Sequence, residues 1–117
     1  MICILDYGSG NVTSVKNMLD FIGIDSCLSN SQKDIERASH IILPGVGSFG
    51  ASMRKIKDRI PLKYLEKEVI KYQKPFLGIC VGMQVLLEKG FENGENEGLG
   101  WIRGSVNKLN VKNNPIP

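Results

Sequence analysis

The sequence lacks long apolar runs and a strong excess of charge of either sign. No apolar stretch approaches the roughly 20 residues that a membrane-spanning helix needs, so we expect no association with a membrane. The formal net charge is only +3, and lysine and arginine are spread along the chain, which argues against a nucleic-acid partner. The first ten residues, MICILDYGSG, contain no basic side chain, so we expect no secretory signal.

Cysteine is also scarce. The chain has three cysteines, Cys3, Cys27 and Cys80, an odd number at irregular spacing. This pattern is typical of neither a disulfide framework nor a zinc site. We therefore expect a protein of the reducing cytoplasm that holds no metal and no other cofactor.

The 117 residues that are present suit one domain of the α/β class. Short apolar segments predict strands, and amphipathic stretches between them predict helices. Because strands and helices alternate and the strands are apolar throughout, we predict a doubly wound, mostly parallel sheet with helices on both faces. The expected strands cover 2–6, 24–29, 40–44, 75–79 and, with weaker alternation, 101–109; the expected helices cover 12–22, 31–38, 51–59, 62–73 and 81–90; and 91–98 is expected to be a polar loop.

Several residues predict where these helices begin and end. Asn11 stands where the first helix needs an N-cap, and Gly23 follows its last turn. Ser31 and Asp34 resemble a capping box, in which each side chain accepts a hydrogen bond from the other residue's N–H. Pro61 ends one helix or begins the next, because proline does not fit a helix interior.

The segment GICVG, residues 78–82, has the pattern of a nucleophile elbow with cysteine in place of serine. Gly78 and Gly82 leave space where the chain turns sharply from a strand into a helix, and the turn strains the backbone of Cys80. The sulfur then lies at a helix N-terminus, which stabilises a thiolate, and the Val81 N–H faces the place of an oxyanion. The alternative is an unreactive cysteine in a glycine-flanked turn.

Two more glycine-bearing turns follow expected strands at the same edge of the sheet, where ligands bind in such folds. The loop in LPGVGSFG can supply the second oxyanion donor that elbow enzymes take from a neighbouring loop, or it is a plain connecting turn. The turn in DYGSGNV suggests a phosphate loop, but Thr13 stands where the dinucleotide motif has glycine or alanine. A glycine-rich turn capped by Asn11 explains it better.

A catalytic thiol needs a base, and the chain has a single histidine, His40. His40 opens the expected strand 40–44, about 13 Å from the edge where that strand ends, at roughly 3.3 Å per residue. We therefore predict a structural or solvent-facing role for His40. The residues present supply a nucleophile and oxyanion donors, but no base.

Four segments, ILDYGSGNVTSVKNML, LPGVGSFGASM, PFLGICVGMQVLLEKG and EGLGWIRGSV, resemble class I glutamine amidotransferases, and among them the glutaminase subunits of imidazole glycerol phosphate synthase. The resemblance covers nearly the whole chain and implies a flavodoxin-like fold. It implies that Cys80 attacks the side-chain amide of glutamine and forms a γ-glutamyl thioester. It assigns the oxyanion strand to Gly45, Val46 and Gly47, and contacts with the substrate to Gln84 and Gly47.

The resemblance also implies a partner, a (βα)₈-barrel cyclase subunit that uses the ammonia to make imidazole glycerol phosphate in histidine biosynthesis. The turn DYGSGN is expected near that partner. The histidine and glutamate of the family's catalytic triad have no counterpart in residues 1–117. We therefore expect an N-terminal part of a single amidotransferase domain, incomplete at its C-terminus and inactive by itself.

Two other interpretations stay open. A related amidotransferase could supply ammonia to another acceptor, such as a sugar in surface-glycan synthesis, with the same glutaminase site. A protein of another class, a non-catalytic flavodoxin-like binding module, would keep the fold and use Cys80 only for packing.

Overall fold

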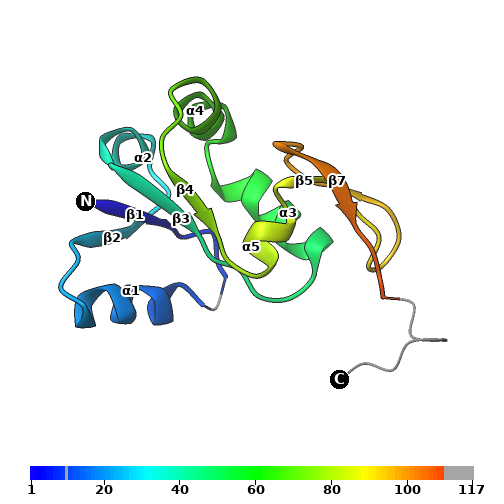
Figure 1. The fold of residues 1–117 in the computed structure, drawn as a ribbon, viewed down its shortest axis with the longest axis horizontal. Helices are drawn as coiled ribbons and strands as arrows, with labels where there is room; N and C mark the ends of the chain where they lie inside the picture. Colours follow the sequence, from blue (N-terminus) through cyan, green and yellow to red (C-terminus); the bar gives the residue numbers. More distant parts are fainter. Residues whose placement is uncertain (10, 110–117) are drawn as a thin grey trace.

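A computed structural model of the chain describes residues 1–9 and 11–109. Strands and helices alternate through the first two-thirds of the chain, and short strands follow (Figure 1). The strands are β1 (Ile2–Leu5), β2 (Ser26–Ser29), β3 (His40–Leu43), β4 (Phe76–Gly78), β5 (Leu87–Gly90), β6 (Asn96–Glu97) and β7 (Ile102–Val106). The helices are α1 (Val12–Phe21), α2 (Gln32–Arg37), α3 (Phe49–Arg59), α4 (Leu62–Glu66), the π-helical turn η1 (Lys67–Lys71) and α5 (Val81–Gln84). The end of the chain, for which the sequence indicates a turn or loop over 111–117, lies outside the described residues.

The main sheet has four parallel strands in the order β2-β1-β3-β4. Its register places Cys3 beside Cys27 and Ile2 beside His40. Both neighbours of β1 come later in the chain, so the sheet grows to each side of the first strand. The prediction of a mostly parallel sheet is confirmed for these strands.

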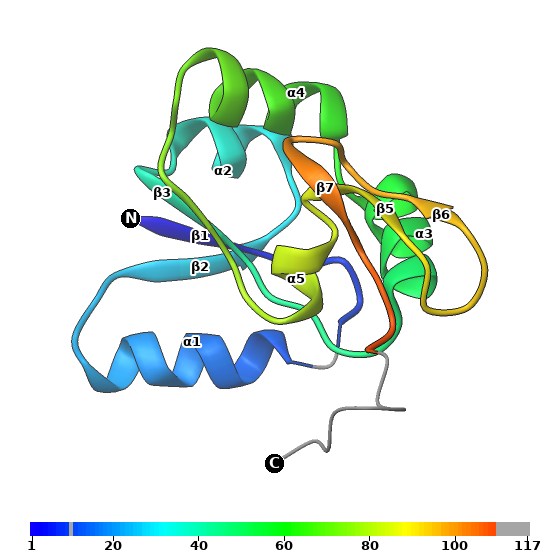
Figure 2. The same cartoon turned by 45° about the vertical axis from the view of Figure 1, so that its right-hand side comes forward.

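Helices cover both faces of this sheet, as predicted (Figure 2). On one face, α1 packs Val12, Val15 and Leu19 against Ile4 and Ile42 of the strands. On the other face, α2, α3 and α4 pack their apolar side chains against alternate residues of β1 and β3. This second and larger cluster includes Cys3, Leu5, Ile35, Ile41, Leu43, Phe49, Met53, Ile56 and Leu65. The two clusters separate because successive strand residues point to opposite faces.

The expected helix caps are present in part. The Ser31 hydroxyl accepts from the Asp34 N–H at 3.2 Å, as in a capping box. The Asp34 carboxylate, however, accepts from the Ser29 hydroxyl at 2.6 Å and not from the Ser31 N–H. The hydroxyls of Ser29 and then Ser31 lower the pKa of Asp34. Gly23 follows the last turn of α1 with a positive φ of 78°, but the Asn11 side chain makes no capping hydrogen bond.

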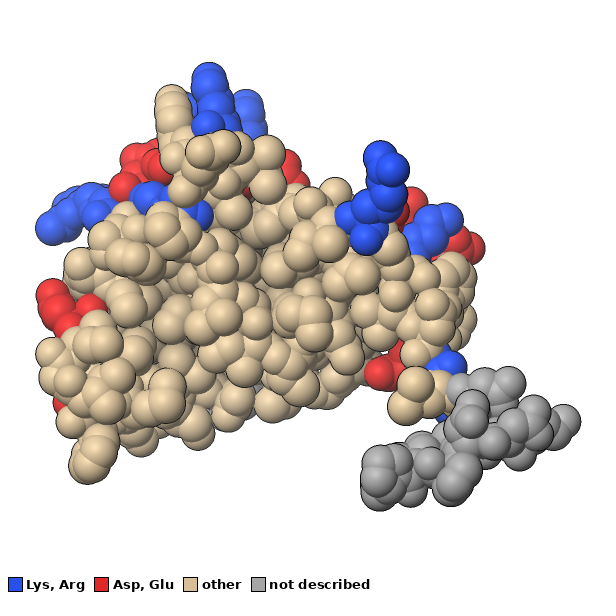
Figure 3. Space-filling model, in the orientation of Figure 1, with Lys and Arg blue, Asp and Glu red and all other residues tan. Residues whose placement is uncertain are grey.

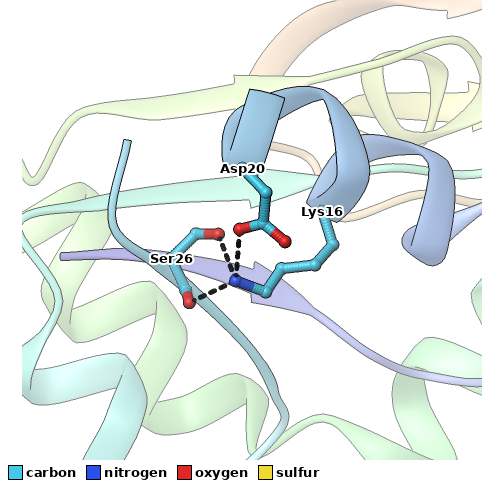
Figure 4. Close-up of polar contacts among 3 residues, drawn as sticks. All are labelled: Lys16, Asp20 and Ser26. Atoms are coloured by element: carbon cyan, nitrogen blue, oxygen red, sulfur yellow. Dashed lines mark hydrogen bonds and ion pairs between the residues drawn. The ribbon is translucent and has the colours of Figure 1, made fainter. Parts of the chain in front are cut away.

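A lysine ties α1 to the beginning of β2. The Lys16 ammonium donates to Asp20 Oδ1 at 2.8 Å, one helical turn further along α1 (Figure 4). It also donates to the Ser26 carbonyl at 2.9 Å and to the Ser26 hydroxyl at 3.1 Å. These bonds fix the helix against the outer strand, far from the edge at which the strands end.

The helix predicted over 81–90 is wrong beyond its first turn. Helix α5 ends at Gln84, and β5 begins at Leu87 and pairs with β6 and β7 in a second, three-stranded sheet. The Leu86 carbonyl accepts from the Ile102 N–H at 2.9 Å. The backbone here is therefore hydrogen-bonded to a segment further along the chain and not to the next turn of a helix. The weakly predicted strand over 101–109 is confirmed at Ile102–Val106, whereas the loop expected over 91–98 contains β6.

The remaining helices follow the predictions closely. Pro61 is the N-cap of α4, and the segment predicted as one helix over 62–73 consists of α4 and the π-helical turn η1.

No helix in the described part of the chain is both long enough and apolar enough to span a bilayer. Lysine, arginine and acidic side chains lie intermixed at the rim of the face in Figure 3, so the described residues form no patch of one charge on this face.

Candidate active site

The turn between β4 and α5 lies at the edge where the parallel strands end (Figure 1). Cys80 is part of this turn and directly precedes α5. Its backbone has φ 57° and ψ −122°, and its side chain is exposed. A positive φ strains an L-residue, and in the described residues only Cys80 and Gln73 show it apart from glycines. The strained turn predicted for residue 80 is therefore present, while the nucleophilic role stays a prediction.

Two glycines make this turn possible. A Cβ atom at Gly78 would lie 2.6 Å from the Gly82 carbonyl oxygen and 2.8 Å from the Met83 Cα. A Cβ atom at Gly82 would overlap the Leu43 carbonyl oxygen at the end of β3. The elbow, residues 78–82, thus packs on itself and on the neighbouring strand too closely for any other residue type at these two positions.

The helix behind Cys80 is shorter than predicted. Helix α5 contains only Val81–Gln84, so few aligned peptide groups contribute to a dipole at its N-terminus. The Cys80 carbonyl accepts from the N–H groups of Met83 and Gln84, at 3.0 and 3.1 Å. Stabilisation of a thiolate by a long helix, as inferred from the sequence, is therefore not supported, and any stabilisation depends on nearby N–H groups.

The glycine-rich loop at 45–47 lies directly against the elbow. A Cβ atom at Gly45 would overlap the Val81 side chain and would lie 2.9 Å from the Gly82 nitrogen. Val46 is about half exposed, and Gly47 has a φ of 96°. The backbone N–H groups of residues 45–47 and of Val81 donate no hydrogen bond to any described residue. Donors from both segments predicted to form an oxyanion hole are thus unpaired and close together.

Tyr7, to which no sequence motif pointed, also contacts this loop. Its hydroxyl donates to the Pro44 carbonyl at 2.6 Å, and it would lie 2.6 Å from a Cβ atom at Gly45. Burial raises the pKa of Tyr7, and the Ser9 hydroxyl opposes this shift in part. The sequence gives one indication of this contact. Tyr7 directly follows an apolar strand, in a turn expected at the same edge of the sheet as the loop 45–47.

Gln84 and His40 lie in different places relative to Cys80. Gln84 ends α5, one helical turn after Cys80, and is half-buried. His40 begins β3 at the opposite edge of the sheet, where it is exposed and its Nδ1 lies 2.9 Å from the Ser39 hydroxyl. The structure therefore groups the predicted nucleophile, oxyanion loop and Gln84, and it leaves His40 apart as expected.

The first turn and the cavities add no further group to this site. The Lys55 ammonium donates to the Gly8 carbonyl at 3.3 Å, and the Arg59 guanidinium occupies the space beside the Gly8 Cα. Side chains of α3 therefore cover Gly8 in the turn whose sequence resembles a phosphate loop. A cavity of about 550 Å³ lies between α4, η1 and Trp101, and none of the predicted site residues lines it.

Comparisons with known proteins agree with the fold and the motifs. The sequence matches the family Glutamine amidotransferase class-I over residues 3–110. It is 42% identical to the imidazole glycerol phosphate synthase subunit HisH 1 of Campylobacter jejuni (strain 81-176), over 96% of this chain and 58% of that protein. It is 43% identical to the subunit HisH 2 of Methanococcus maripaludis, over 97% of this chain and 55% of that protein. The chain thus spans little more than half the length of these relatives.

The fold has a similar counterpart among solved structures. A putative peptidase E protein from Listeria monocytogenes superposes with a TM-score of 0.61 at 15% identity, over 75% of this chain and 50% of that one. At this identity the likeness concerns the α/β fold alone. The family match covers nearly all of the chain, and the identities to curated members exceed 40%. The chain belongs to the class I glutamine amidotransferases.

Proposed function

We propose that this chain carries the nucleophile and oxyanion donors of a glutaminase, and that the ammonia released is used to make imidazole glycerol phosphate in histidine biosynthesis. The observation that carries the proposal is the strained, exposed Cys80 beside the unpaired N–H groups of residues 45–47 and Val81. A buried packing cysteine would need neither the strain nor the adjacent donors.

The chemistry follows from these groups. The Cys80 thiolate attacks the side-chain amide carbon of glutamine, and a C–S bond forms while the carbonyl oxygen becomes an oxyanion. The N–H groups of residues 45–47 and Val81 stabilise this oxyanion, and each such donor is worth roughly 3–4 kcal/mol. The C–N bond then breaks as the nitrogen takes up the proton that the Cys80 thiol released on ionising, so that neutral ammonia leaves. Water then hydrolyses the γ-glutamyl thioester to glutamate and restores the thiol. Gln84 and Gly47 hold the substrate.

The proposed partner is a cyclase subunit of (βα)₈-barrel form. Two relatives are named as subunits of imidazole glycerol phosphate synthase, and this chain shares more than 40% of its residues with each. The glycine turns that end β1 and β3 lie at the same edge of the sheet as Cys80, so a partner docked at that edge would receive ammonia directly. A heterodimer in the cytoplasm is the expected assembly.

The substrate is tested by NMR titration of a Cys80→Ser chain, which removes the thiol and keeps a side chain of similar size. L-glutamine should shift the amide signals of residues 45–47 and of Gln84, whereas L-asparagine, shorter by one methylene, should not. Equal responses to both amino acids, or shifts confined to residues outside the site, would favour the non-catalytic binding module over the glutaminase.

The partner is tested separately by size-exclusion chromatography of the chain mixed with a cyclase subunit. Co-elution as a one-to-one complex supports delivery of ammonia to imidazole glycerol phosphate synthesis. Glutamine binding without co-elution would instead support a related amidotransferase that serves another acceptor.

A further inference from the structure

We propose that Tyr7 is a positioning residue that fixes the oxyanion loop, residues 45–47, against the elbow through the Pro44 carbonyl. The inference rests on the proposed function, since a positioning role has meaning only if the loop N–H groups stabilise an oxyanion. Tyr7 itself touches no reacting atom in this assignment and acts through the loop.

The contacts place Tyr7 at the point where the loop begins. Its side chain is 1% exposed, and its hydroxyl donates to the Pro44 carbonyl at 2.6 Å, across 37 residues of sequence. Pro44 has no N–H group, so this carbonyl is the group through which the backbone at residue 44 can be held by a side chain. The next residue, Gly45, passes so close to the Tyr7 hydroxyl and to the elbow that a Cβ atom does not fit.

The hydroxyl therefore sets the direction of the peptide plane between Pro44 and Gly45. The carbonyl of Pro44 and the N–H of Gly45 belong to one rigid planar unit and point in opposite directions. A bond that holds the carbonyl towards Tyr7 consequently aims the Gly45 N–H away from Tyr7. Rotation of this plane would turn the first donor of the loop away from its place.

A role in packing alone does not account for the hydroxyl. Burial raises the pKa of Tyr7, so the phenol stays protonated and remains a donor. Phenylalanine would fill the same space but would leave the buried Pro44 carbonyl without its partner. The buried Ser9 hydroxyl lies near enough to Tyr7 to lower its pKa, but it makes no hydrogen bond of normal geometry within the described residues, and the Tyr7 hydroxyl donates to the Pro44 carbonyl.

The test compares two reactions of Cys80 in Tyr7→Phe and native chains. In the first, the thiolate displaces thiophenolate from a γ-glutamyl thiophenyl ester, passing through an oxyanion and leaving a γ-glutamyl thioester on Cys80. In the second, it displaces iodide from iodoacetamide, which forms no oxyanion. We expect Tyr7→Phe to slow acylation about tenfold or more, up to the 10²–10³ range seen when an oxyanion donor is removed. Alkylation should stay unchanged.

Tyr64→Phe is the control for the loss of a tyrosine hydroxyl, because Tyr64 lies in α4 and is 37% exposed. It should change neither reaction. Equal acylation of native and Tyr7→Phe chains would overturn the positioning role, as would a parallel loss of acylation and alkylation. A native chain whose Cys80 is alkylated but never acylated would instead overturn the proposed function, and the inference with it.

Amide chemical shifts give a readout that does not need the chemistry. Tyr7→Phe should shift the backbone amide signals of residues 45–47 and leave those of α1 unchanged. Unchanged signals at residues 45–47 would show that the loop holds its place without the hydroxyl, which contradicts the inference.

Discussion

Gly82 is the residue on which the closeness of the elbow to the sheet depends. A methyl group there would overlap the Leu43 carbonyl oxygen, so Gly82→Ala must push the elbow away from β3. We expect a loss of about 1–3 kcal/mol in the free energy of unfolding, typical of overpacking, and slower alkylation of Cys80 by iodoacetamide. Urea denaturation and peptide mass mapping measure the two effects.

Gly23→Ala is the control for this variant. Its φ is 78°, so alanine costs about 1–2 kcal/mol there, but no atom lies within 4 Å of the added methyl group and the residue is remote from the elbow. It should lower stability and leave alkylation of Cys80 unchanged. A Gly82→Ala chain with native stability and native reactivity would contradict the described packing of the elbow.

Cys3 contributes a pH dependence of stability. Burial, and then the neighbouring Cys27, raises the pKa of the Cys3 thiol from 9.0 to about 12. The thiol ionises more readily in the unfolded chain, so its contribution to stability is complete below pH 9 and is lost as the pH rises through 9 towards about 12. The free energy of unfolding should therefore fall more steeply over this range in the native chain than in Cys3→Ala, when both are measured by urea denaturation. Equal slopes would contradict the raised pKa.

At the scale of elements, α3 is held by a cap that directly follows the oxyanion loop. The Ser48 hydroxyl accepts from the Ala51 N–H at 3.2 Å. Ser48→Ala should lower the free energy of unfolding by about 1 kcal/mol, while Ser14→Ala, on the exposed side of α1, should change it by less than about 0.5 kcal/mol. Thermal or urea denaturation of both variants measures the difference, and equal values would argue against the cap.

The elements also show how far the sequence determines this fold. The central strands β1 and β3 could be predicted because each is a short apolar run that is mostly buried, whereas the outer strands β2 and β4 leave Leu28 and Leu77 exposed. The helix over 81–90 could not be corrected from the sequence, since VLLEKG suits a helix locally and becomes a strand only by pairing with a segment 15 residues further on. The contact of Tyr7 with Pro44 was missed for the same reason, because it joins residues that are far apart in the chain.

At the scale of the whole molecule, the parallel sheet separates His40 from Cys80. The histidine begins β3 and the cysteine follows the end of β4, so they occupy opposite edges. His40→Asn should therefore leave the pH profile of Cys80 alkylation unchanged. A shifted profile in His40→Asn would mean that the histidine reaches the thiol.

Because His40 is distant from the thiol, the chain by itself should also hydrolyse glutamine slowly. General acid and base assistance typically raises a reaction rate 10²–10⁴-fold.

The measurement that tests the central claim most directly is mass-spectrometric mapping of the chain after reaction with a glutamine analogue in which a chloromethyl ketone replaces the amide. The thiolate displaces chloride and forms a stable thioether, so the labelled residue is the one that meets the substrate carbon. We predict a single label on Cys80, slowed by L-glutamine but not by L-asparagine, and no label in Cys80→Ser. A label on Cys3 or Cys27 in the folded chain, or a label on Cys80 that glutamine does not slow, would contradict the assignment of this elbow as a glutaminase site.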